Sequence, residues 1–218
     1  MLPFTEADFF AVFARYNQSL WPAPVAAYAV GVAVLLAALI GGRRASIAVG
    51  AGLALMWAVN GAGYHLWQFA RINPAAYGFG AAFLLQAALL LGYGIGGRLR
   101  FGFENRAALW VGLALVLYAA LVYPLLGAAG GHGWPRSPVF GLAPCPTTIF
   151  TLGILLLARP PLPWAVLAIP ILWAAIGSTA AVLLSVPEDL GLLVAAVAAG
   201  AFALRANRRA KDLRAAPG

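Results

Sequence analysis

Long apolar stretches, separated by short breaks rich in glycine, proline and charged residues, fill this sequence from residue 22 to residue 206. Most of these stretches are close to the roughly 20 residues that an α-helix needs to cross the hydrocarbon core of a bilayer. A segment in lipid must satisfy its own backbone hydrogen bonds, so such stretches form helices. The pattern predicts an all-α polytopic membrane bundle of about seven transmembrane helices, at residues 22–41, 45–69, 74–97, 107–128, 146–158, 163–185 and 188–206.

The composition supports the same class. Of the 218 residues, 63% are hydrophobic and 9% are charged, whereas soluble domains average about 25% charged residues. The apolar stretches leave no room for a separate soluble domain. We therefore expect one integral membrane domain over residues 1–218, with an interfacial helix at 5–21, the transmembrane bundle at 22–206 and a basic cytoplasmic tail at 207–218.

The basic residues indicate the orientation of the bundle. Eleven of the 14 arginines and lysines fall in alternate loops and in the tail, while Arg15, Arg71 and Arg136 fall on the other side. Basic loops resist translocation, so this bias predicts the N-terminus outside and the C-terminus in the cytoplasm. The net charge of +8 follows from this topology and implies no nucleic-acid partner.

The segment before the first span has the pattern of an amphipathic helix. Phe9, Phe13, Tyr16 and Leu20 share one helical stripe, and Thr5 is placed to cap the N-terminus. We expect a helix that lies flat on the outer membrane surface. The alternative is a lid over an outward-facing site.

The fifth span is too short to cross a membrane alone. Residues 146–158 give about 20 Å of helix, against about 30 Å of hydrocarbon. The missing length belongs to the preceding loop, for which we predict a re-entrant path at 130–145; the alternative is a locally thinned bilayer. We expect Cys145, the only cysteine, to cap the helix, where the helix dipole favours a reactive thiolate. The alternative is an inert buried cysteine.

Polar side chains gather in the outer half of the predicted bundle. Trp57, Asn60, Tyr64 and Gln68 fall on one helical face, which we expect to point into the bundle. Together with the loop before Cys145, this face predicts an outward-opening pocket. Its candidate binding residues are Tyr64, His65, Gln68, Arg71, His132, Arg136, Cys145, Thr147 and Thr148.

The chemistry of that pocket leaves alternatives open. A positive helix end and an arginine favour an anion or a polar solute, and Arg71 and Arg136 are also candidates for pairing Glu188 or Asp189. His65, His132 and Cys145 are the residue types that bind zinc or copper, although no spacing rule supports a metal site. No motif requires a cofactor.

Four stretches give a resemblance that covers almost the whole chain. They are LPFTEADFFAVFARYNQSLWP, YHLWQFARINPAAYGFG, GLAPCPTTIFTLG and PEDLGLLVA. In this order they resemble a family of bacterial multi-pass membrane proteins that is carried as a domain of unknown function. The resemblance implies a multi-pass protein of the bacterial cell (inner) membrane and assigns no catalytic residue.

Three functional classes follow from these observations. The first is binding or transport of a small polar or anionic solute through the outward-facing pocket. The second is a metal- or thiol-dependent membrane enzyme or sensor built on Cys145, His65 and His132. The third is a non-catalytic accessory subunit of a membrane complex. Whether the protein is an enzyme stays open, and the expected partners are the lipid bilayer, a small solute, and a second copy or another membrane protein.

Overall fold

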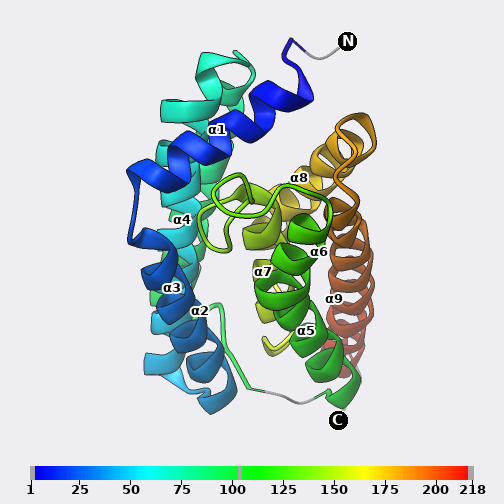
Figure 1. The fold of residues 1–218 in the computed structure, drawn as a ribbon. Coiled ribbons are helices and arrows are strands. Elements are labelled where there is room, and N and C mark those ends of the chain that lie inside the picture. Colours follow the sequence, from blue (N-terminus) through cyan, green and yellow to red (C-terminus); the bar gives the residue numbers. More distant parts are fainter. Residues whose placement is uncertain (1–2, 103–104, 216–218) are drawn as a thin grey trace.

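The computed structural model describes residues 3–102 and 105–215 (Figure 1). Within these residues the chain is helical between its loops, with one isolated antiparallel bridge between Phe101 and Ala158 and no strand. The all-α prediction is therefore confirmed for the described chain. The elements are α1 (Glu6–Ser19), α2 (Ala23–Ile40), α3 (Arg43–Val59), η1 (Asn60–Gln68), η2 (Phe69–Arg71), α4 (Ala76–Ile95), α5 (Arg106–Leu117), η3 (Tyr118–Val122), α6 (Tyr123–Ala129), α7 (Pro144–Leu155), α8 (Trp164–Leu183), η4 (Pro187–Leu190) and α9 (Gly191–Ala215).

Six helical segments in the described chain are long and apolar enough to cross a membrane. They are Ala23–Ile40, Arg43–Arg71, Ala76–Ile95, Arg106–Ala129, Trp164–Leu183 and Pro187–Leu213. Each matches one of the predicted spans. The remaining predicted span corresponds to α7, which has 12 residues and is shorter than a membrane-spanning helix.

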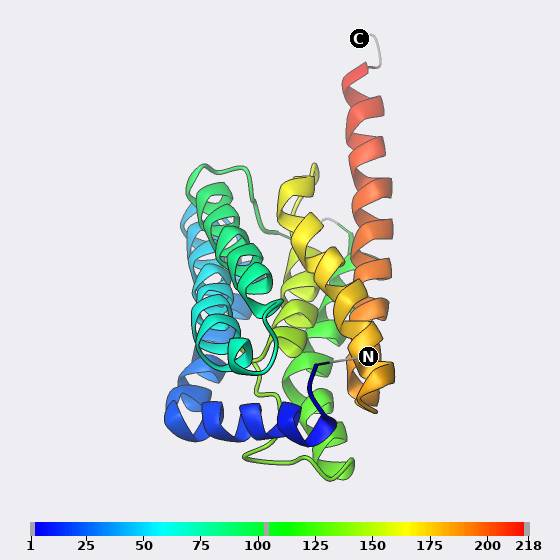
Figure 2. The same cartoon turned by 90° about the horizontal axis from the view of Figure 1, so that it is seen from above.

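The bundle has two distinct ends. At one end, α1 lies crosswise over the other helices, as both views show (Figures 1 and 2). We call this the α1 end. At the opposite end, Arg43, Arg100 and Arg159 come together from three separate segments, and α9 extends past the neighbouring helices (Figure 2). We call this the arginine end.

Helix α1 forms as its sequence predicts. The Thr5 hydroxyl accepts a hydrogen bond from the backbone N–H of Asp8, and the Thr5 hydroxyl and N–H donate to the Asp8 carboxylate at 2.7 and 3.0 Å. These bonds lower the pKa of the Asp8 carboxyl, so they stabilise the cap until the pH falls through that lowered pKa. The predicted stripe is buried at Phe9, Phe13 and Tyr16.

Helix α7 occupies the centre of the bundle. Eleven of its residues are buried, and Cys145 is partly exposed. It packs against α5 where two glycines meet, because a Cβ atom built on Gly112 would lie 2.6 Å from the carbonyl oxygen of Gly153. Small residues allow such close helix contacts in membranes, where dispersion forces replace the hydrophobic effect between helices.

Substitution of Gly112 by alanine is therefore expected to destabilise the protein by about 1–3 kcal/mol, because the added methyl group must push two backbones apart. The matched control is Gly92→Ala on α4, where a Cβ would meet nothing within 4 Å. That control is expected to be neutral or slightly stabilising, since alanine is the better helix former. Unfolding in mixed detergent micelles measures both; an equal effect of the two changes would contradict the close α5–α7 contact.

The loop before α7 enters the helix bundle. Its residues Ser137, Phe140, Leu142 and Ala143 are buried. The Phe140 ring lies over Gly31 of α2, where a Cβ atom would come within 2.6 Å of it. Helix α7 then begins at Pro144, with Ala143 as its N-cap. The expectation that Cys145 caps this helix was therefore wrong: the extended backbone ends one residue before Pro144, which places Cys145 inside the first turn.

Candidate functional site

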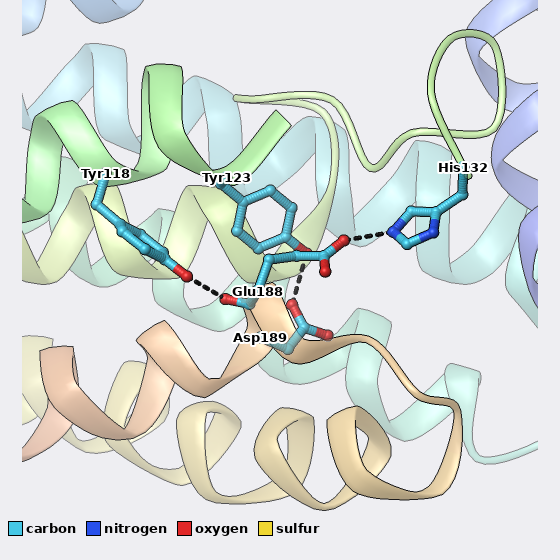
Figure 3. A network of polar contacts seen from close by, with 5 residues as sticks. All are labelled: Tyr118, Tyr123, His132, Glu188 and Asp189. Atoms are coloured by element: carbon cyan, nitrogen blue, oxygen red, sulfur yellow. Dashed lines mark hydrogen bonds and ion pairs between the residues drawn. The ribbon is translucent and has the colours of Figure 1, made fainter. Parts of the chain in front are cut away.

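A cluster of polar side chains, which we call the carboxylate cluster, is buried at the α1 end (Figure 3). Glu188 and Asp189, which are 0% and 2% exposed, come from η4 at the start of the last span. His132 Nε2 lies 2.5 Å from Glu188 Oε1, and the Tyr123 hydroxyl donates to Asp189 Oδ1 at 2.5 Å. The Tyr118 hydroxyl donates to the backbone oxygen of Glu188 at 2.7 Å. Two adjacent carboxylates thus have different partners.

Glycines in the neighbouring helices make room for this cluster. A Cβ atom on Gly127 would lie 3.1 Å from Glu188 Oε1 and 3.2 Å from the His132 ring, and one on Gly191 would lie 2.4 Å from the Tyr118 ring. The ends of α6 and α9 therefore approach the polar groups closely at these two positions. Any side chain there would displace one of the cluster's hydrogen-bonding rings.

Cys145 belongs to the same cluster. Its thiol contacts the Asp189 carboxylate and lies beside the Trp173 indole. A Cβ atom built on Gly177 of α8 would be 3.6 Å from the Cys145 sulfur and 3.7 Å from Trp173 Nε1. The cluster therefore connects Cys145 of the central helix α7 with the Glu188–Asp189 pair at the α1 end of the bundle.

Helix α1 and the loop before α7 cover the cluster. The Phe10 ring of α1 stacks on the His132 ring, with the ring centroids 4.4 Å apart. The Asn17 amide on the same helix donates to the backbone oxygens of Pro135 and Ser137, at 2.7 and 2.8 Å. These contacts hold α1 against the loop that carries His132.

The Asn17 contacts give a prediction about local stability. Asn17→Ala removes one buried and one partly buried hydrogen bond and is expected to loosen α1 by about 1–3 kcal/mol, because two backbone oxygens lose their partner. Gln18→Ala, on the exposed neighbouring position, is the matched control. Amide hydrogen exchange of α1 and of residues 133–139 measures the effect. Equal exchange in the two variants would contradict a role for Asn17 in closing the site.

The structure does not group the three predicted metal ligands. His132 contacts Glu188, and Cys145 contacts the neighbouring Asp189. His65 is ringed by Phe79, Phe83 and Trp173, with centroids 4.6 to 5.8 Å away. Among the described residues, no three His, Cys, Asp or Glu side chains are grouped as metal ligands.

The other candidates on the predicted helical face pack in the interior. Trp57, Asn60, Tyr64 and Gln68 are all buried, as the spacing predicted. The Tyr64 ring stacks between the rings of α1 and η2, on Phe13 and Phe69. Tyr64 and Gln68 therefore line the protein interior beneath α1 rather than an open pocket.

The two threonines after Cys145 have structural partners. Thr148 donates to the Pro144 oxygen of its own helix at 2.8 Å. Thr147 accepts a hydrogen bond from the Asn60 amide at 3.3 Å, and that amide also donates to Gly141 at 3.1 Å. These bonds fix the buried loop and α7 against the π-helix η1.

The arginines do not pair with the carboxylates. Arg71 is exposed and donates to the backbone oxygen of Trp67, and Arg136 is exposed on the loop. In the structure, His132 and Tyr123 bind the carboxylates instead. The prediction paired the acids with the arginines because both were assigned to the same side of the membrane. Glu188 and Asp189 are buried, however, whereas the two arginine side chains stay at the surface and do not reach them.

Sequence reasoning missed the central members of the site. Glu188 and Asp189 were considered only as partners of Arg71 and Arg136, and Tyr118, Tyr123 and Trp173 were not identified as site residues. One signal was available: two acids open an apolar stretch, and ionisable residues in such positions usually have a function. The tyrosine partners carry no comparable signal in the sequence.

Comparison with known proteins gives one match. Residues 6–214 match a family described as "Family of unknown function (DUF6064)". No curated protein and no solved structure matches the chain. The match covers nearly every described helix.

Proposed function

This chain belongs to the DUF6064 family. We propose that it is a multi-pass membrane protein that couples movement of a small polar solute to proton binding at Glu188 and His132. The described helices support the multi-pass architecture. The proton-binding role is argued from the cluster at the α1 end.

The observation that carries the proposal is the pairing of a fully buried glutamate with a histidine. Burial of an unpaired charge is costly, so a buried glutamate requires a partner. His132 Nε2 and Glu188 Oε1 lie 2.5 Å apart, and the pair can hold one proton between them. Histidine is the side chain whose charge ordinarily changes near neutral pH.

The surroundings of the pair favour proton exchange over a purely structural role. Within the described chain, Glu188 Oε2 has no hydrogen-bond partner although it is buried. Asp189 stands next in the sequence and is also buried. The two neighbouring carboxyl groups thus lie together in a buried position, where only a few side chains can compensate their charge. Chains of Asp, Glu and His side chains serve as proton relays in transporters.

The charged residues of the cluster indicate which kind of ligand it can bind. Glu188 and Asp189 provide two negative groups against one histidine, and Arg71 and Arg136 lie outside the cluster. A proton or a polar solute with a positive group therefore suits this site better than an anion, which the sequence analysis favoured because of the two arginines.

We place the α1 end outside the cell and the arginine end in the cytoplasm. The basis is the distribution of arginine and lysine, because basic loops remain on the cytoplasmic side. In this orientation α1 lies along the outer surface of the membrane, and Phe10 covers His132. Helix α1 then serves as the lid over the site, and the loop 130–143 is its re-entrant wall.

Solute-dependent proton movement tests the proposal. Purified protein in liposomes is exposed to amines, amino acids, sugars and carboxylic acids in turn, while a pH electrode records the outer solution. We expect at least one class to change the pH with wild-type protein and with Glu6→Gln, an exposed control on α1. Glu188→Gln is expected to abolish the change. No response from any class, or an unchanged response in Glu188→Gln, would refute the function.

A further inference from the structure

A second site is present at the arginine end, far from the carboxylate cluster. A cavity of about 350 Å³ opens there between the start of α3, the loop after α4 and the segment after α7. Its wall includes Arg43, Arg100 and Arg159, together with Gly42, Ser46 and Phe101. Cavities of about 300–1,000 Å³ are typical of small-ligand sites.

The walls of this cavity are held by specific contacts. The Ser46 hydroxyl donates to the Gly42 oxygen at 2.9 Å and accepts the Phe101 N–H at 3.2 Å. The Arg159 N–H donates to the Arg100 oxygen at 2.7 Å, beside the bridge between Phe101 and Ala158. The Ser46 side chain thus joins the start of α3 to the segment at Phe101, and a backbone hydrogen bond joins that segment to Arg159, so the backbones that carry the three arginines are held together.

The electrostatics of the cavity favour an anion. The charged residues on its described wall are all arginines. Helix α3, with 17 residues, begins at Arg43 after Gly42, which has a φ of 88°, and no side chain caps it. The first N–H groups of a helix carry a partial positive charge and bind phosphate readily. Guanidinium groups bind phosphate oxygens through paired hydrogen bonds.

We propose that this cavity binds a phosphate group at the arginine end of the bundle. The phosphate belongs either to the headgroup of an anionic phospholipid or to free phosphate in solution. Basic pockets between spans on the cytoplasmic side bind anionic headgroups in this way. The site does not depend on the proposed function, because it shares no residue with the carboxylate cluster.

The decisive variant is the double substitution Arg43→Gln and Arg100→Gln, which removes two positive charges that come from different segments of the cavity wall. Arg44→Gln is the matched control, because Arg44 is exposed next to Arg43 and lies outside the cavity wall. Binding is measured by native mass spectrometry of the purified full chain with phosphatidylglycerol, phosphatidylcholine or inorganic phosphate. Thermal unfolding in phosphatidylcholine confirms that all variants are folded.

We expect wild-type protein and Arg44→Gln to bind phosphatidylglycerol in preference to phosphatidylcholine. The double variant is expected to bind phosphatidylglycerol at least about tenfold more weakly, since the loss of even one charged hydrogen bond contributes a factor of that order. Binding of inorganic phosphate with the same variant dependence would identify free phosphate as the ligand. Equal binding of both lipids without phosphate binding, or equal losses in Arg44→Gln and the double variant, would overturn the proposal.

Discussion

Glu188→Ala is expected to destabilise the protein by about 3–5 kcal/mol, the typical cost of removing one partner from a buried ion pair. The substitution leaves His132 buried at 6% exposure without its carboxylate partner. It also empties the space next to Gly127 that the Glu188 side chain fills. Unfolding in mixed detergent micelles measures the loss.

The double-mutant cycle with His132→Ala separates the pair from general packing. If the two side chains act together, the double variant is expected to lose less than the sum of the single losses. Glu6→Ala on the exposed face of α1 serves as the control and is expected to have little effect. Additive losses in the cycle would contradict a direct interaction between Glu188 and His132.

Phe140→Ala is expected to cost a similar amount, about 3–5 kcal/mol, because a large ring is lost from a packed interior. Phe140 is 2% exposed. Its ring centroid lies 4.9 Å from that of Phe150 and 5.0 Å from that of Tyr28, and the ring covers Gly31.

Val139→Ala provides the control for this loop, since Val139 is only half-buried next to Phe140. Phe140→Ala is expected to raise amide exchange throughout residues 137–143, whereas Val139→Ala leaves it nearly unchanged. Equal stability and equal exchange in both variants would show that the loop does not depend on its insertion between α2 and α7.

The fold was largely predictable because membrane spans are encoded by one-dimensional patterns. The first predicted span, 22–41, differs from α2 by one residue at each end. The short fifth span was also evident, because its length alone excludes a full crossing. The π-helical turns of η1 were not predicted, since a short stretch of i→i+5 hydrogen bonds leaves the apolar pattern of the sequence almost unchanged.

The site was predictable only in part, because its contacts join distant segments. His132 and Cys145 were identified as polar residues at the same end of the bundle. Their carboxylate partners were missed: His132 and Glu188 are 56 positions apart, and no local spacing relates them. The charges of Arg71 and Arg136 were equally visible in the sequence but remain at the surface, since long side chains reach water at little cost.

The proposed function requires that Glu188 takes up a proton in the buried pair with His132. Infrared difference spectroscopy of the reconstituted protein during a pH titration tests this most directly, because a protonated carboxyl group has a C=O band that the carboxylate lacks. Other carboxyl groups, including Asp189, also contribute to this region, so we predict that one component of the pH-dependent carboxyl band of wild-type protein and of Glu6→Gln is missing in Glu188→Gln. A band that is unchanged in Glu188→Gln would refute proton binding at Glu188.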